Sequence, residues 1–163
     1  MRLALVCAVL LCTAASASAA LPRHGTLVPG RSLGGVHLGE KAAAVQSALG
    51  RQYGVCRGCR TTTWYFTYRR FTRPGLAVEF TGGRVSAVYT IWRPAGWSAP
   101  RGLRLGAVEA QVTDLAGPLI VLACSGYDAL TRDSTAEVRT AYYIVDGKLW
   151  GFGLLPAHAN PCR

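Results

Sequence analysis

Two stretches decide the fold prediction: VHLGEKAAAVQSALG (residues 36–50) and LRLGAVEAQVTDLAG (residues 103–117). Each contains Leu-Gly near its start, continues with apolar residues at helical spacing and closes with a glycine. A closing glycine is typical of the left-handed residue that ends a helix. The matched residues keep a constant offset in numbering, which indicates an internal duplication. We therefore predict two helices of about three turns, over residues 40–49 and 107–116.

Alternating apolar and polar residues follow each predicted helix, which is the pattern of a half-buried strand. In the first half the predicted strands are residues 61–70, 75–80 and 84–92, with Val85, Ala87, Tyr89 and Ile91 pointing inward after a glycine turn. In the second half they are residues 120–124, 137–145 and 148–155, the last two joined by an Asp146–Gly147 turn. The prediction is an α+β fold: two tandem helix-plus-antiparallel-hairpin repeats, with the helices packed on one side of antiparallel sheet and the other face open.

The chain organisation follows from this pattern and from the first twenty residues. Met1-Arg2 is followed by an apolar run and by small residues with an A-x-A pattern, as in a secretory signal peptide. We predict a signal peptide at 1–20, a leader at 21–31, a first repeat at 32–93, a linker at 94–100 and a second repeat at 101–163 with a disulfide-pinned C-terminal tail. No other stretch is long enough to span a bilayer, so we expect a secreted, extracytoplasmic protein without a transmembrane segment in the mature chain.

The amount and the distribution of positive charge limit the classes of partner that the protein could bind. The chain has 18 Lys and Arg residues against 8 Asp and Glu residues, a formal net charge of +10. The arginines are spread along the sequence, whereas nucleic-acid-binding proteins concentrate them in a stripe. Together with the export signal, this spacing argues against nucleic acid. The positive net charge still predicts weak electrostatic contact with anionic polymers of the cell envelope, and salt would screen this contact.

Four cysteines follow the predicted signal peptide: Cys56, Cys59, Cys124 and Cys162. Outside the cytoplasm an even number indicates disulfides, and four cysteines allow three connectivities. We favour Cys56 with Cys59 and Cys124 with Cys162, because Cys162 lies in the tail. An alternative is that Cys56-Arg57-Gly58-Cys59 is a thiol-disulfide exchange motif whose thiol pKa the flanking arginines lower. It follows the end of a predicted helix, however, so the helix N-terminus that usually lowers such a pKa is missing.

The combination of Leu-Gly, a short helix ending in Gly, an aromatic strand and a glycine-turn hairpin, with VHLGEKAAAVQSALG in this chain, resembles a known repeat. It is similar to the repeat of beta-lactamase inhibitory protein and of the small lipoproteins of the outer-membrane barrel assembly machinery. It also resembles uncharacterised exported actinobacterial proteins. The resemblance covers about residues 32–155. It implies a non-catalytic, protein-binding module with an exposed sheet face.

Candidate binding residues come from the face of the sheet that we expect to be open. Tyr65, Arg69, Trp92 and Tyr142 could lie there, and Tyr, Trp and Arg are enriched at binding hot spots. For catalysis we find no nucleophile motif around Ser125, and several of the carboxylates fall near helix starts or in turns. The prediction is therefore a secreted binding or inhibitor-like module with an unknown protein partner, no enzymatic activity, no cofactor and no metal. The alternative is an extracytoplasmic redox protein that uses Cys56 and Cys59.

Overall fold

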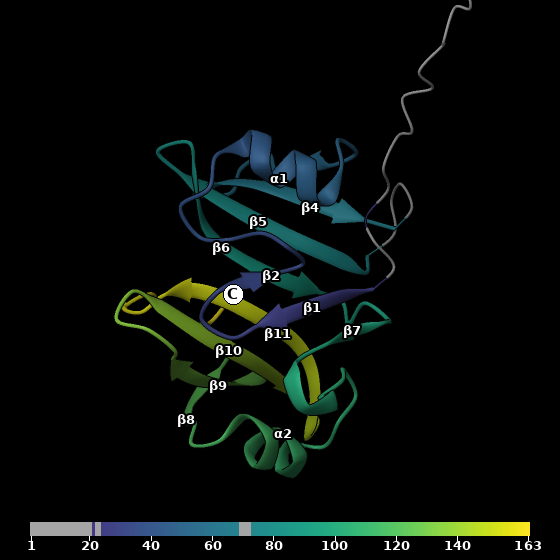
Figure 1. Ribbon diagram of the computed structural model, residues 1–163, viewed down its shortest axis with the longest axis vertical. Helices are drawn as coiled ribbons and strands as arrows, with labels where there is room; N and C mark the ends of the chain where they lie inside the picture. The colour runs from purple at the N-terminus through teal and green to yellow at the C-terminus, as the bar shows by residue number, and fades with distance from the viewer. Residues whose placement is uncertain (1–20, 22–23, 69–72) are drawn as a thin grey trace, which may run out of the picture.

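The core of the structure is one eight-stranded antiparallel sheet (Figure 1). The computed structural model describes residues 21, 24–68 and 73–163 of the chain, so the predicted signal peptide at 1–20 lies outside the described residues. In spatial order the strands are β3 (Gly54–Val55), β4 (Thr62–Thr67), β5 (Gly75–Thr81), β6 (Arg84–Ile91), β11 (Lys148–Pro156), β10 (Val138–Val145), β9 (Tyr127–Asp133) and β8 (Ile120–Cys124). The two central strands, β6 and β11, are therefore far apart in the sequence.

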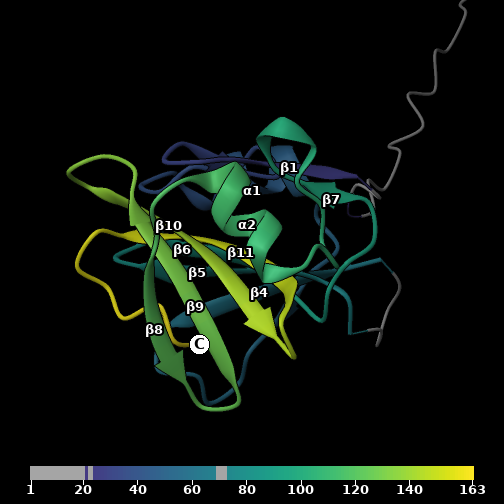
Figure 2. The same ribbon diagram turned by 90° about the horizontal axis from the view of Figure 1, so that it is seen from below.

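One face of this sheet is covered by two short helices and a second, three-stranded sheet (Figures 1 and 2). The helices are α1 (Ala42–Leu49) and α2 (Glu109–Ala116), and a 3-10 turn, η1, spans Pro100–Gly102. The small sheet has the order β2 (Ser32–Leu33), β1 (Gly25–Val28) and β7 (Trp97–Ser98). Its residues Leu27, Leu33 and Trp97 join Val45 of α1 and Val112 of α2 in one buried cluster. These elements make up a single helix-side core.

The prediction of an α+β fold built from two tandem helix-plus-antiparallel-hairpin repeats is wrong, because the protein is mostly β. Strands hold 47% of the described residues and helices 14%. Each helix is only eight residues long, because the residues before it are extended and pair with a hairpin. The Val85 N–H donates to the Glu40 carbonyl, and the Leu149 N–H donates to the Ala107 carbonyl. The leader and the linker also supply β1 and β7, which pair with each other in parallel.

A β-bulge in the β5–β6 hairpin changes which face of the sheet each side chain of β6 points to, so the predicted faces of this hairpin are wrong in part. The register between β5 and β6 shifts between Glu79 and Phe80, and such a shift turns the following side chains to the opposite face. Val85 therefore joins the helix-side core, whereas Ala87 and Tyr89 belong to a second cluster on the other face. The predicted inward row of 85, 87, 89 and 91 is thus divided between the two faces.

The second cluster gives the open face of the sheet its own small core. It consists of Ala87, Ala129, Ala141, Tyr143 and Leu155, with Tyr89, Cys124, Tyr127 and Ala159 packed against it. Most of these side chains are alanines or tyrosines, so large rings lie among very small neighbours. The open face is therefore uneven.

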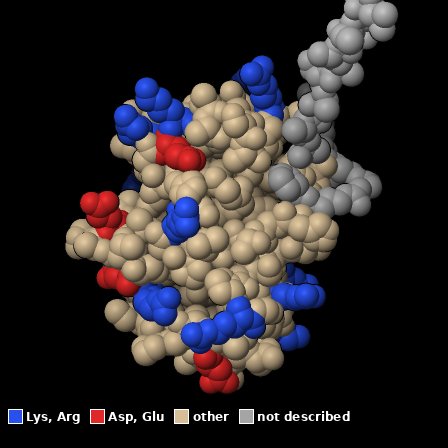
Figure 3. All heavy atoms as spheres, viewed as in Figure 1, with Lys and Arg blue, Asp and Glu red and all other residues tan. Residues whose placement is uncertain are grey.

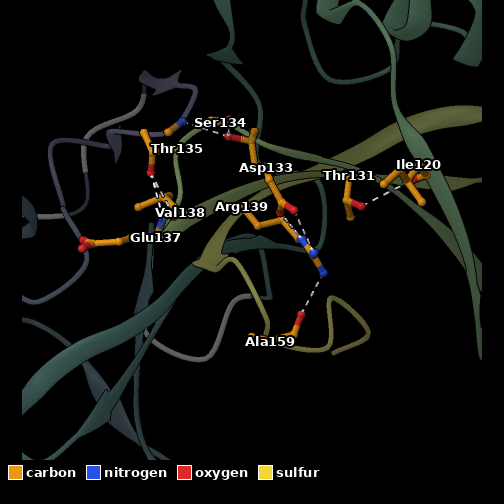
Figure 4. A network of polar contacts seen from close by, with 11 residues as sticks. Ile120, Thr131, Asp133, Ser134, Thr135, Glu137, Val138, Arg139 and Ala159 are labelled. Atoms are coloured by element: carbon orange, nitrogen blue, oxygen red, sulfur yellow. Dashed lines mark hydrogen bonds and ion pairs between the residues drawn. The ribbon is translucent and has the colours of Figure 1, made fainter.

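Two disulfides are present, Cys56–Cys59 and Cys124–Cys162, which confirms the favoured pairing. The second bond ties the chain end to β8, across the open face. The tail is also held where the Arg139 guanidinium, which pairs with Asp133 at 2.7 Å, donates to the Ala159 carbonyl at 3.3 Å (Figure 4). Tyr127 adds a hydroxyl that donates to the Arg163 carbonyl at 2.8 Å. The tail is thus fixed at three points on the open face.

The two disulfides should differ in their effect on stability. Replacing Cys124 and Cys162 by Ser opens a loop of about 39 residues and should lower the free energy of unfolding by about 4 kcal/mol. Replacing Cys56 and Cys59 by Ser opens a loop of about four residues and should cost about 2 kcal/mol. Urea denaturation of both double variants measures the difference. Equal losses would contradict the loop-closure account.

Candidate binding site

A hollow of about 540 Å³ opens on the uncovered face of the sheet. It crosses the ends of β6, β11 and β10 and the turn between β8 and β9. The lining of the hollow includes five aromatic side chains and one guanidinium group: Tyr89, Trp92, Tyr127, Tyr143, Trp150 and Arg163. A concave, mostly aromatic lining with a few polar groups is typical of a ligand site.

Two glycines of β11 make room for the floor of this hollow. Tyr143 pairs with Gly151 across the β10–β11 ladder. A Cβ at Gly151 would lie 3.3 Å from the Tyr143 ring, and one at Gly153 would lie 2.7 Å from the Tyr143 hydroxyl. The Tyr143 ring therefore lies along β11, over Gly151 and Gly153. A side chain at either glycine would collide with the ring.

The outer wall is a pair of tryptophans with an unusual backbone. The Trp92 and Trp150 rings meet edge to face with centroids 5.8 Å apart, and the Arg73 guanidinium lies 4.5 Å from the centre of the Trp92 ring. Trp92 is 49% exposed. Trp92 and Arg93 both have positive φ, 54° and 44°, a conformation that is costly for residues with a side chain. Strain of this kind is concentrated at functional sites.

The inner end of the hollow is polar. The Arg163 guanidinium lies 5.8 Å from the Tyr89 ring centre and 3.9 Å from a Glu79 carboxylate oxygen. The Tyr89 hydroxyl donates a hydrogen bond to Glu79 at 3.0 Å. Burial first, and then the neighbouring Glu79 charge, raise the pKa of Tyr89 well above its usual value. Tyr89 is therefore a neutral donor at physiological pH.

Tyr143 has a hydroxyl that is buried without a hydrogen-bond partner in the described part of the chain. Burial raises the pKa of this phenol, and the positive charge of Arg163 opposes the shift. An unpaired buried hydroxyl costs about 1–3 kcal/mol, so such groups are uncommon in folded proteins. This one belongs to the lining of the hollow.

The structure brings together only part of the predicted site. Trp92 lines the hollow. Tyr65 pairs with Ala77, which pairs with Tyr89, so Tyr65 points to the same open face, beside the hollow. Tyr142 does not: it is 2% exposed and packs edge to face on Phe152 in the helix-side core. Arg69 lies outside the described residues.

Sequence reasoning missed the residues that form most of the hollow: Tyr89, Tyr127, Tyr143, Trp150 and Arg163. The available signal was the set of alanines and glycines within otherwise bulky strands, such as Gly151 and Gly153. Small residues in a strand often mark a place where another group approaches closely.

Charged side chains occupy separate parts of the face that carries the helices. Lys and Arg side chains gather at the upper left and along the lower part of this face, with uncharged surface between the two sets and acidic groups beside them (Figure 3). That face therefore has no continuous basic stripe of the kind that binds nucleic acid. Within the described residues, no cluster of three or more His, Cys, Asp or Glu side chains could hold a metal ion.

The Cys56-Arg57-Gly58-Cys59 motif does not line the hollow. It forms the connection between β3 and β4, where the Cys59 sulfur lies 4.0 Å from the Tyr65 hydroxyl. Its cysteines are joined to each other. The motif follows a two-residue strand and does not begin a helix, so no helix N-terminus is there to lower a thiol pKa.

Comparisons with known proteins give a fold and no function. No family model matches the sequence, and no curated protein matches it. Among solved structures the chain is similar to a DUF4309 family protein, YjgB, from Bacillus subtilis, with 18% sequence identity and a TM-score of 0.51. The match covers 71% of this chain and 78% of that chain. The resemblance to beta-lactamase inhibitory protein and the barrel assembly lipoproteins stays a prediction.

Tyr143→Phe tests the unpaired hydroxyl. The variant keeps the ring and removes the buried polar group, so the free energy of unfolding should rise by about 1 kcal/mol. Tyr127→Phe is the matched control, because its hydroxyl bonds to the Arg163 backbone; it should lose about 1 kcal/mol. Chemical denaturation measures both. A loss of stability in Tyr143→Phe would mean that its hydroxyl is hydrogen-bonded in solution.

Proposed function

We propose that this protein is a non-catalytic binding protein that acts outside the cytoplasm, and that its partner docks in the aromatic hollow of the open sheet face. The observation that carries this proposal is the Trp92–Trp150 wall. It holds a half-exposed indole on a strained backbone, beside the tyrosines of the floor. Tryptophan and tyrosine are enriched at binding hot spots.

The chemistry of the hollow favours binding over catalysis. Tyr89 and Tyr143 both have raised pKa values because they are buried, so both keep their protons near neutral pH. A general base must give up its proton in that range. Glu79 accepts the Tyr89 proton and the Tyr143 hydroxyl is buried, so the floor is suited to contact a bound group through its aromatic rings.

The proposed location outside the cytoplasm rests on two features. The structure holds two disulfides, and such bonds persist in oxidising compartments. The sequence begins with a predicted signal peptide at 1–20. None of the helices that the structure describes is long and apolar enough to cross a membrane.

Affinity capture with residues 21–163, from culture supernatant and envelope extract, tests the proposal. Trp92→Ala and Trp150→Ala should each weaken capture of the recovered partner about tenfold or more, because each removes a hot-spot ring. Tyr65→Ala reports whether the contact extends beyond the hollow. Val55→Ala, at an exposed residue on the far edge of the sheet, is the control and should bind like the wild type.

Thermal denaturation must show that the variants fold, since loss of binding in an unfolded variant carries no information. Full binding by a folded Trp92→Ala, Trp150→Ala double variant would overturn the proposal. An insulin-reduction assay separates it from the redox alternative. Turnover that Cys56→Ser abolishes would support thiol-disulfide exchange instead.

A further inference from the structure

Strand β8 is an unprotected edge of the large sheet. It follows β9 as the outermost strand, and β9 is its one neighbour in the described sheet (Figure 2). An edge strand presents backbone N–H and C=O groups without a neighbour, and these can pair with another chain. Ile120 and Val121 are 63% and 59% exposed, although both are large and apolar. They point to opposite faces, so β8 is exposed on both sides.

The opposite edge of the same sheet is protected. Strand β3 has only two residues, and exposed arginines Arg51, Arg57 and Arg60 lie close to it in sequence. Short edge strands and charged side chains are the usual devices that prevent edge-to-edge pairing. Strand β8 has five residues, IVLAC, and neither device. The contrast between the two edges indicates that the free edge of β8 pairs with another strand.

We propose that β8 pairs with β8 of a second copy of this chain, in antiparallel register, to form a continuous sheet across a twofold axis. Charge selects this occupant. The chain carries a net charge of +10, so two copies repel one another wherever arginines meet. Residues 115–127 contain no charged side chain, and the guanidinium groups of Arg101 and Arg132 bond to carbonyls that precede β8, at residues 115 and 116, so the strand itself adds no repulsion. An acidic partner, which the rest of the surface would attract, finds no cation in this strand.

The strand is also complementary to itself in size. Antiparallel pairing centred on Leu122 places Val121 opposite Ala123 of the second copy and Ile120 opposite Cys124 of the second copy. The exposed Val121 then meets a small alanine, and the exposed Ile120 meets the half-buried Cys124–Cys162 disulfide. Cross-strand pairs of this kind contribute to strand pairing. The twofold axis keeps both open faces on the same side of the joined sheet.

The contact is small, so the dimer should be weak. A five-residue strand buries less area than a standard protein interface, which places it among transient complexes. We expect a dissociation constant on the order of 100 μM. Raising the salt concentration should tighten the dimer, because it screens the repulsion between two positive chains while leaving apolar contacts in place.

Sedimentation equilibrium of the full mature chain, from about 10 μM to about 1 mM, tests the proposal. Wild type should pass from monomer to dimer over this range. Val121→Lys places two like charges at the joint and should raise the dissociation constant at least about tenfold. Val55→Lys, on the protected edge and at similar exposure, is the matched control and should dimerise like wild type.

Amide hydrogen exchange shows which strand forms the dimer contact. Amides of β8 should gain protection as the protein concentration rises, while those of β3 should not. A monomer at the highest concentration, or a dimer that folded Val121→Lys retains, would overturn the proposal. A dimer whose protected amides lie elsewhere would also overturn it.

Discussion

The whole architecture depends on the pairing of β6 with β11, which in the described sheet is the one strand pairing that joins the two four-stranded halves. The joint is tightened by Thr90, whose hydroxyl accepts a buried hydrogen bond from the Phe152 N–H at 2.9 Å. A Cβ at Gly151 would lie 2.8 Å from that hydroxyl, so glycine is needed there. The same residue makes room for the Tyr143 ring. One glycine thus serves both the fold and the floor of the candidate site.

Sequence periodicity located most of the long strands, because hairpins such as β5–β6 and β10–β11 alternate clearly and are joined by glycine turns. It did not reveal the fold class. Strands of two residues, such as β2 and β7, are too short for any period, and the residues around Gly39 and Gly106 pair with hairpins before the helices begin. Such pairing depends on contacts between distant segments, which local patterns do not report.

The candidate site was harder to predict than the sheet. Trp92 was found because a large aromatic residue ends an alternating strand. Tyr142 was expected on the open face, but residues 140–144 are all buried, so no polar–apolar alternation separates the face of Tyr142 from that of Tyr143. Arg163 reaches the hollow only because the Cys124–Cys162 bond returns the tail to the sheet. The sequence indicated that bond but contained no information on the surface that the tail would cross.

The open face and the β8 edge are connected through the turn that follows β8. Ser125 and Tyr127 line the hollow, and they come directly after the last residues of the strand. In a dimer joined at β8, the two hollows would therefore lie near the joint and face the same direction. A partner with two docking segments could occupy both, and the second segment would bind at a high effective concentration. A weak dimer would then be stabilised by the partner itself, because a ligand that bridges two copies favours the joined state.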